Sequence, residues 1–340
     1  MVDSDTTGTR SLPVALGSER TETGGVGVLL RIAMVLAKRL AGAFVVVFGA
    51  ATLGFAALQL LPGDPVDWLL GPSTSASPAL RAQVRADYGF DRPVLAQYLS
   101  YLNMLVHGDL GTSYQLQKPV STLIVTQLRP TAELAVSALA LALVLAVIAA
   151  VATAGRRPIL RASVSTAELA VTSAPQFWVG ILLLTVFSFQ LKIFPVAGAQ
   201  TPAALVLPAV TLALSIAGML SQVLREGLEA ALSQPFIVTA RARGLGEAEV
   251  RLRHAFRHAA APLLTLTGWL IGTLLGGVVP VETVFGRPGI GALVLQAVTS
   301  RDMPVVMGVI LLSALVFVAA STIVDLLHAA LDPRIRTNEG

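Results

Sequence analysis

The sequence of 340 residues contains no cysteine, only three lysines and few charged residues of any kind. Without cysteine, the chain forms no disulfide and no thiolate metal site. Lys38, Lys118 and Lys192 each follow a residue other than glycine, so the chain has no GxxxxGK(S/T) loop to hold nucleotide phosphates. Only 13% of the residues are charged, 54% are hydrophobic, and the mean hydropathy is +0.75. A soluble fold of this length cannot bury so much apolar surface, and we therefore predict an all-α integral membrane protein.

Ionisable residues are also missing from the middle of the apolar stretches. Glu133, Glu168 and Asp325 fall near the ends of these stretches, where water or lipid headgroups are within reach. Carriers coupled to protons or sodium place acids or bases in mid-membrane, because the coupling ion must bind there. The formal net charge of +4 is too small to indicate nucleic acid as a partner. We expect no metal site and no cofactor within the chain.

Six apolar stretches are long enough to cross about 30 Å of hydrocarbon and predict six transmembrane helices. They lie at residues 40–61, 133–154, 165–189, 204–224, 262–281 and 305–327. With both chain ends in the cytoplasm, 16 of the 24 Lys and Arg residues fall on the cytoplasmic side, as the positive-inside rule requires. We therefore expect a multi-pass protein of the cytoplasmic membrane with both termini inside.

The polar segments divide the chain. Residues 1–30 are rich in Ser, Thr and Gly and lack the apolar core of a signal peptide, so we expect a disordered cytoplasmic tail. Residues 31–61 hold either an interfacial helix and the first span, or the first span alone with an early start. Residues 62–132 form a long external insertion, residues 133–327 the transmembrane core, and residues 328–340 a cytoplasmic tail.

Two short helices are expected within the insertion. Ser77-Pro78 and Arg92-Pro93 mark their beginnings, and the helices end near Tyr88 and Val106. Two explanations of the insertion remain open: an external platform for a substrate-delivering protein, or a structural cap over the helix bundle.

A basic segment, residues 225–261, interrupts the transmembrane core and is expected in the cytoplasm. Val238–Gly244 predicts a short helix closed by a glycine, where a chain reverses at little steric cost. A second helix is expected from Glu247, because its acidic first turn and its basic later residues suit the helix dipole. The spacing of four apolar residues places them on one face of this helix, which we expect to lie as an amphipathic helix at the membrane surface: Leu252, Ala255, Phe256 and Ala259.

The run TARARGL at 239–245, then RLRHAFRHA and Pro262, resembles the coupling loop of the dipeptide, oligopeptide and nickel branch of ABC importer permeases. Other importer branches open this motif with an acidic residue, where this chain has Val238. Further stretches resemble the dipeptide permease B-type subunit in the same order: LLPGDP, YGFDRPVLAQY, HGDLGTSY, VETVF followed by PG and G, RD.P and DLLHAALDPRIR. The resemblance covers about residues 35–336. It implies the type I importer permease fold, with six transmembrane helices and a long external insertion after the first span.

In that family the loop helix docks in a groove on the ATP-hydrolysing subunit. The resemblance therefore assigns coupling to the ATPase to six residues: Thr239, Ala240, Arg241, Ala242, Arg243 and Gly244. The small Ala240 and Ala242 are expected in the groove, with Arg241 and Arg243 at its rim. The implied partners are a second homologous permease, two ATPase domains that bind ATP and Mg, an external substrate-binding protein and membrane lipid.

The fifth span has glycines at every fourth position, at Gly268, Gly272 and Gly276. Such a stripe of small residues lets another helix approach closely. The resemblance implies that this span also lines the pore, so helix packing and a place on the pathway both remain open. Trp269, beside the stripe, faces either the pore or lipid.

The loop after the fifth span is expected on the external side. Glu282, Phe285 and Arg287 are candidate contacts with the binding protein, although Arg287 stands where the family usually has a small or apolar residue. The alternative is a re-entrant piece that plugs the outer end of the bundle.

The function implied is that of a permease subunit, not an enzyme, which moves di- or oligopeptides inward by alternating access while partners hydrolyse ATP. A secondary carrier is the first alternative, and the missing mid-membrane charges count against it. A non-importing protein, either an exporter or a membrane scaffold, is the second.

Overall fold

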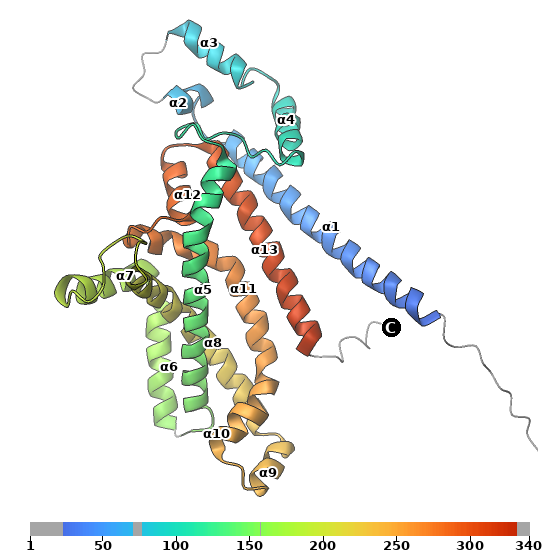
Figure 1. Ribbon diagram of the computed structural model, residues 1–340, viewed down its shortest axis with the longest axis vertical. Coiled ribbons are helices and arrows are strands. Elements are labelled where there is room, and N and C mark those ends of the chain that lie inside the picture. Colours follow the sequence, from blue (N-terminus) through green and yellow to red (C-terminus); the bar gives the residue numbers. More distant parts are fainter. Residues whose placement is uncertain (1–22, 71–76, 157, 332–340) are drawn as a thin grey trace, which may run out of the picture. The chain divides into compact units, whose positions relative to one another are not determined.

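The computed structural model describes residues 23–70, 77–156 and 158–331. Within these ranges the regular structure is helical, apart from one antiparallel bridge between Thr112 and Pro119. The expected all-α class is therefore confirmed. The chain divides into two units, Met1–Phe44 and Val45–Gly340. Their boundary falls inside helix α1 (Thr23–Gln59) (Figure 1).

The ends of the chain differ in part from the expected tails. α1 begins at Thr23, so its first turns fall within the segment 1–30 that we expected to be disordered. The last helix likewise continues to Leu331, into the expected C-terminal tail. Residues 1–22 and 332–340 lie outside the described residues.

The second unit contains the remaining helices. In chain order they are α2 (Pro65–Leu70), α3 (Pro78–Asp87), α4 (Val94–Val106), α5 (Val120–Thr153), α6 (Pro158–Ser173), α7 (Gln176–Leu183), η1 (Leu184–Gln190), α8 (Ala203–Leu232), α9 (Pro235–Ala242), α10 (Glu247–Glu249), η2 (Val250–Ala255), α11 (Phe256–Val284), α12 (Ile290–Thr299) and α13 (Met303–Leu331). The elements η1 and η2 are π-helices, in which backbone hydrogen bonds join residues i and i+5.

Four helical stretches are long and apolar enough to cross a membrane: Ala37–Gln59, Val120–Thr153, Ala203–Leu232 and Met303–Val324. Two bent pairs of helices pass the same test of length and composition when each pair is taken as one span. With them, the described residues provide the six spans predicted from the sequence.

Proline accounts for both bends. α6 and the stretch Gln176–Gln190 meet at 102°, and Pro175 stands at the break. The other pair, Glu247–Leu274 and Gly276–Val284, bends by 56°. Because a proline ring clashes with the carbonyl four residues earlier, Pro280 opposes a regular helix at Gly276, where this bend lies.

α8 lies at the centre of the bundle and packs against α5 and α11. On α5, every fourth residue is a fully buried alanine: Ala138, Ala142, Ala146 and Ala150. These alanines share apolar clusters with fully buried leucines of α8, including Leu212, Leu220 and Leu224. Because alanine has a small side chain, the two backbones approach closely, which suits helix packing within a membrane.

Both short helices predicted for the insertion are present, as α3 and α4. Ser77 caps α3 by accepting a hydrogen bond from the backbone N–H of Leu80 at 3.2 Å. Ion pairs of Arg81 with Asp67 and of Arg85 with Asp64 hold α3 beside the start of the insertion. These contacts give the insertion a defined structure of its own.

α5 joins two opposite ends of the second unit. It begins at Val120, although we expected the insertion to continue to residue 132, so the first turns of α5 replace the end of that segment. Near its other end, the carbonyl of Val151 accepts a hydrogen bond from Arg251 of η2 at 3.2 Å. The insertion and the segment from α9 to η2 therefore lie at opposite ends of the helices (Figure 1).

Candidate functional site

The predicted coupling segment forms α9 and the turn after it. Pro235 occupies the first turn of α9, where a helix does not use the backbone N–H that proline lacks. The helix ends at Ala242, and Gly244 then adopts a φ of +79°. A Cβ at Gly244 would meet no atom within 4 Å, so glycine is needed for its conformation rather than for space. The predicted short helix closed by a glycine is confirmed.

Most of the candidate coupling residues lie on the exposed side of α9 and its turn: Thr239, Arg241, Ala242, Arg243 and Gly244. Ala240 is the exception, since only 5% of it is exposed and it packs with Ile237 in the core beneath α9. The structure therefore turns Ala240 away from the surface on which we expected it. Val238 is 67% exposed and offers an apolar side chain that the sequence analysis did not select.

A chain of charged contacts fixes α9 to the helix bundle. The guanidinium of Arg241 donates to both carboxylate oxygens of Glu247, at 2.9 and 3.3 Å. Glu247 also lies 3.7 Å from Arg251, and Arg251 in turn donates to the carbonyl of Val151 on α5. Arg241 thus has a partner within the chain. Arg243 is exposed and forms no ion pair with any residue that the structure describes.

The π-helix η2 changes which residues of the second loop helix are buried. Ala255 and Ala259 of the predicted apolar face are buried within the chain, whereas Leu252 is 53% exposed. A π-turn adds a residue to the repeat and rotates the side chains away from a 3.6-residue period. Val250 and Arg251 take the buried positions instead.

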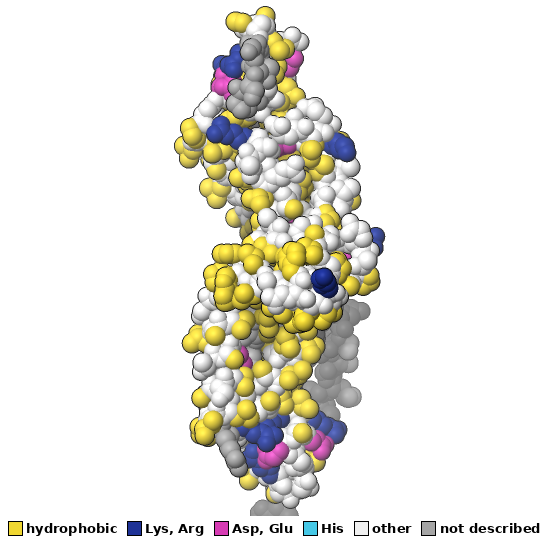
Figure 2. All heavy atoms as spheres, turned by 90° about the vertical axis from the view of Figure 1, so that its left-hand side faces the viewer, with side chains coloured by type: hydrophobic (Ala, Val, Ile, Leu, Met, Phe, Trp, Pro, Cys, Tyr) yellow, Lys and Arg dark blue, Asp and Glu magenta, His cyan; other side chains and the backbone are white. Residues whose placement is uncertain are grey.

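Charged side chains mark this end of the protein. Figure 2 shows Lys, Arg, Asp and Glu gathered at its lower end, which Figure 1 identifies with α9 and α10. Few charged side chains appear on the surface between this end and the insertion. This distribution is typical of a protein whose middle faces lipid and whose loop faces water.

A buried ion pair that the sequence analysis missed lies where α8 leads towards the loop. Arg225 of α8 pairs with Glu168 of α6, and their side chains are only 4% and 9% exposed. Arg225 also donates to Thr153 of α5 and Ser165 of α6, each at 2.7 Å. We counted Arg225 among the cytoplasmic arginines and expected water or headgroups near Glu168, whereas in the structure the two side chains are buried against each other. With these hydrogen bonds, the pair joins α5, α6 and α8.

At the opposite end of the bundle, Glu282 is the centre of another buried polar cluster. Its carboxylate accepts hydrogen bonds from the hydroxyl of Thr131 at 2.6 Å and from the backbone N–H of Ala292 at 3.0 Å. A Cβ at Gly289 would lie 2.0 Å from this carboxylate, and a Cβ at Gly291 would lie 2.7 Å from the backbone of Val279. The motif VETVF, followed by PG and G, therefore packs the loop between α11 and α12 against α5 and against the end of α11.

Phe285 and Arg287 are buried beside this cluster, with 3% of each exposed. Arg287 lies 3.5 Å from Glu133 and donates to the carbonyl of Pro130 on α5. All three candidate contacts with a binding protein, Glu282 included, are therefore interior residues in this conformation. A groove of about 670 Å³ runs between their loop and α12, lined in part by Pro288 and Gln296.

The glycine stripe of α11 serves packing at two of its three positions. A Cβ at Gly268 would lie 2.1 Å from the side chain of Val324, and one at Gly272 would lie 2.6 Å from Phe317. α13 therefore packs directly on these two glycines. A Cβ at Gly276 would meet nothing within 4 Å, and Trp269 is 54% exposed. None of the described residues covers this part of α11.

Comparison with known proteins gives concordant matches. Residues 116–337 match the family model described as the binding-protein-dependent transport system inner membrane component, and residues 32–135 match the model of its N-terminal part. A Brucella abortus (strain 2308) protein named as a peptide transport system permease is 37% identical over 311 residues, covering 89% of this chain and 98% of that protein. The glutathione transport system permease protein GsiC of Salmonella choleraesuis (strain SC-B67) is 36% identical over 301 residues, covering 88% and 97%.

Among solved structures, a chain of the inward-facing MetNI methionine ABC transporter aligns with a TM-score of 0.50 and 18% identity. The alignment covers 62% of this chain and 96% of that chain. At this identity the match shows a shared fold.

Proposed function

Because the chain belongs to the family of binding-protein-dependent transport system inner membrane components, we propose that it is one pore-forming permease subunit of an ATP-driven peptide importer. The relatives named as peptide and glutathione transport permeases support this substrate class. The observation that carries the proposal is α9, an exposed short helix fixed to one end of a membrane-spanning bundle. The chain has no phosphate-binding loop of its own, so α9 is the element through which partners deliver the energy of ATP.

We assign ATP and Mg binding to two ATPase domains on partner subunits and place α9 in a groove of one of them. Val238 and Ala242 fill the groove, and Arg243 faces an acidic rim. Displacement of α9 passes to α5 through the contacts of Arg241, Glu247 and Arg251, and it passes to α8 directly along the chain. Only contacts that differ between the inward-open and outward-open states shift their equilibrium, so the groove must hold α9 differently in the two states.

This assignment places α9 and both chain termini in the cytoplasm and the insertion on the external side. The Lys and Arg distribution supports it. Because the chain has no cysteine, single cysteines report the orientation cleanly. We expect Asp91→Cys, in the insertion, to react with an impermeant thiol reagent in intact cells, and Ser233→Cys, after α8, to react only in opened cells. Labelling of Ser233→Cys in sealed cells would contradict the orientation.

On the external side, the proposed partner is a substrate-binding protein that docks over the insertion and the groove beside α12. Glu282, Phe285 and Arg287 then act through the loop whose shape they fix, because their side chains are interior. The second, homologous permease completes the pathway. The described residues leave the part of α11 around Trp269 and Gly276 uncovered, and we assign this surface to the pathway or to that second permease.

Reconstitution tests the proposal. In vesicles containing the chain, the second permease and the ATPase subunits, we expect ATP-dependent uptake of labelled di- and oligopeptides only when the binding protein is present. The chain alone should hydrolyse no ATP. Uptake driven by a pH gradient without any ATPase subunit would identify a secondary carrier instead. ATP hydrolysis without uptake of any peptide would contradict the proposed substrate class.

A further inference from the structure

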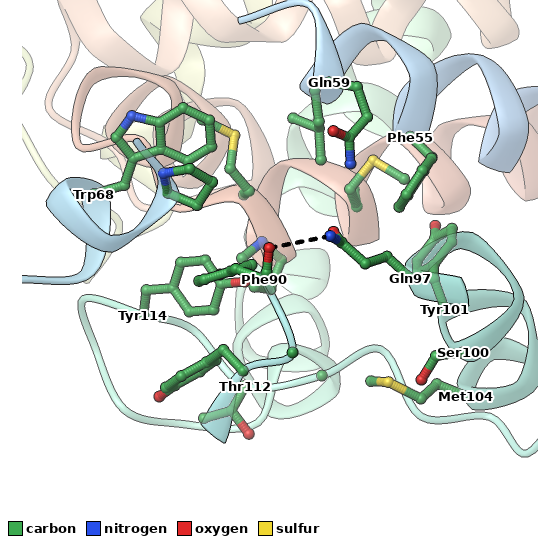
Figure 3. A pocket seen from close by; sticks show the side chains of 18 of the residues that line it. Phe55, Gln59, Trp68, Phe90, Gln97, Ser100, Tyr101, Met104, Thr112 and Tyr114 are labelled. Atoms are coloured by element: carbon green, nitrogen blue, oxygen red, sulfur yellow. Dashed lines mark hydrogen bonds between the residues drawn. The ribbon is translucent and has the colours of Figure 1, made fainter. Parts of the chain in front are cut away.

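A cavity of about 670 Å³ lies between the insertion, the end of α1 and the start of α13. Figure 3 shows that aromatic rings form much of its wall, with Trp68 and Tyr114 on one side and Phe55 and Tyr101 on the other. Met104 of α4 and Met307 of α13 add flexible apolar side chains. A cavity of this size and composition is typical of a binding site for a small, largely apolar ligand.

The cavity lies partly at the depth of the membrane-spanning helices. The hydroxyls of Thr52 on α1 and Tyr98 on α4 are hydrogen-bonded at 2.7 Å, and the ring of Phe55 stacks on that of Tyr101 at 5.9 Å. Thr52 is about 10 Å along the helix from Gln59, where α1 ends, at 1.5 Å per residue. α4 therefore lies beside the last turns of the α1 span instead of above them.

The composition of α4 fits contact with lipid. The helix contains no Asp, Glu, Lys or Arg, and its exposed residues include Leu95, Leu99 and Val106. A helix surrounded by water would expose polar side chains in these places, whereas a helix in the membrane interface buries apolar ones among acyl chains. Leu60, just after α1, is exposed as well and extends the same kind of surface.

The aromatic residues of this region give a second, independent indication. All four tyrosines of the chain lie between Tyr88 and Tyr114, in the insertion. Tyrosine and tryptophan gather where proteins cross the boundary between hydrocarbon and water, because their rings are apolar and their polar groups reach the headgroups. The cavity wall thus has the composition of a membrane interface.

Three polar groups at the cavity lack partners among the described residues, one of them the buried indole N–H of Trp68. The hydroxyl of Tyr101 is buried and has no hydrogen-bond partner among the described residues. Arg92, which also lines the cavity, is exposed and forms no ion pair with any described residue. A ligand for this cavity would combine an apolar body, an oxygen that accepts a hydrogen bond from Tyr101, and an anionic group for Arg92.

We propose that the cavity binds one phospholipid from the leaflet on the insertion side. One acyl chain lies against the aromatic wall, an ester oxygen accepts a hydrogen bond from Tyr101, and the phosphate pairs with Arg92. Held in this way, the lipid fills the space between α4, α1 and α13 and fixes the insertion to the bundle. The proposal requires only the membrane-spanning fold and not the proposed transport of peptides, so the two can fail separately.

The test uses phosphatidylglycerol brominated on its acyl chains, because bromine quenches tryptophan fluorescence on contact. The full chain is purified in detergent, with little lipid present, in two single-tryptophan forms. Replacement of Trp178 and Trp269 by Phe leaves Trp68 in the cavity wall. Replacement of Trp68 and Trp178 by Phe leaves Trp269, which is exposed on α11 in the purified chain without partners and serves as the matched control for nonspecific contact with lipid.

We expect the brominated lipid to quench Trp68 saturably and to leave Trp269 nearly unchanged. Ser100→Phe, which adds a ring at the cavity wall from an exposed position of α4, should abolish the quenching of Trp68. Arg92→Gln should shift saturation to higher lipid concentration and serves as a second variant that leaves the packing intact.

Three results would overturn the proposal. In the first, Trp68 is not quenched at all. In the second, Trp68 and Trp269 are quenched alike and Ser100→Phe changes neither, which would indicate nonspecific mixing with lipid. In the third, a mixture of di- and tripeptides relieves the quenching of Trp68, which would identify the cavity as a peptide site.

Discussion

Asp302, at the start of α13, accepts a hydrogen bond from the hydroxyl of Ser113, which lies 189 residues earlier in the chain. Both side chains are buried. The same carboxylate accepts the backbone N–H groups of Tyr114 at 3.0 Å and Gln115 at 3.3 Å. Two of the recognised sequence motifs, HGDLGTSY and RD.P, therefore form a single structural joint between the insertion and the last span.

Asp302→Asn should loosen this joint. Asparagine keeps the shape but offers an NH₂ group where a carboxylate oxygen now accepts hydrogen bonds, and an unsatisfied buried donor costs about 1–3 kcal/mol. We expect the variant to enter the membrane normally but to be cleaved faster by protease within the insertion. Asp91→Asn, at an exposed position of the insertion, is the control and should behave as the wild type. Equal cleavage rates for all three proteins would show that Asp302 does not hold the insertion.

Removal of one partner of the Arg225–Glu168 pair should destabilise the bundle strongly. A buried charge without its partner typically costs about 3–5 kcal/mol, whereas replacement of both partners by apolar residues costs much less. We therefore expect Arg225→Met and Glu168→Leu each to lower the temperature of thermal unfolding in detergent, and the double variant to recover much of the loss. A double variant no more stable than the worse single variant would contradict the pairing.

The glycines of α11 should respond unequally to the same substitution. Gly268→Ala places a Cβ against Val324 of α13, and added volume in a packed contact costs about 1–3 kcal/mol. Gly276→Ala meets no neighbour and should be neutral or slightly stabilising, since alanine favours the helix. Unfolding temperatures of the two variants test this, and equal losses would argue against direct packing of α13 on the stripe.

Alkaline pH should destabilise the insertion through its tyrosines. Burial, with smaller effects of Tyr88 and Asp302, raises the pKa of Tyr114 to about 12, and burial with the neighbouring Tyr98 raises the pKa of Tyr101 to about 12. The folded-state pKa lies above the ordinary value of 10.0, so the neutral phenols stabilise the fold fully below about pH 10. That contribution is lost as the pH rises from about 10 through 12.

Absorbance of tyrosinate measures this effect, and it reports on the insertion alone because all four tyrosines lie there. We expect the wild type to show a late ionisation near pH 12 that is smaller in Tyr114→Phe. A titration in which Tyr114→Phe removes only signal near pH 10 would show that Tyr114 is not buried in the folded protein.

The sequence predicted the features that depend on local pattern. The beginnings of α3 and α4 and the glycine turn at Gly244 are each determined by a few neighbouring residues, and the structure contains them. Of the six predicted spans, four are single apolar helices among the described residues, and the other two are present when each bent pair is taken as one span. The sequence did not predict the bend at Pro175, which we placed inside one span. It also did not predict the π-helix in which Leu252 is exposed. A single proline changes the direction of a helix, and one extra residue in a turn changes the direction of its side chains. Neither alters the apolar composition of the segment from which a span is predicted.

The buried polar contacts were missed for a different reason. Arg225 pairs with Glu168 across 57 positions of sequence, and no local pattern indicates which charge near a span end finds a partner. Glu282 was selected as an outer contact on its motif alone, yet its motif glycines provide the space that its buried carboxylate occupies. Ala240 was selected for its size, but its position on α9 relative to Ile237 turns it inward.

The most direct test of the central claim compares Ala242→Trp with Ala79→Trp. Both alanines are exposed, the first on α9 and the second on α3 in the insertion, so the pair separates the effect of the place from that of the substitution. The measurement is the amount of ATPase subunit that co-purifies per membrane-inserted chain, together with ATP hydrolysis stimulated by the binding protein. We predict that Ala242→Trp enters the membrane but loses bound ATPase and stimulated hydrolysis, and that Ala79→Trp retains both. Normal co-purification and normal stimulated hydrolysis in Ala242→Trp would contradict the role of α9 as the coupling element.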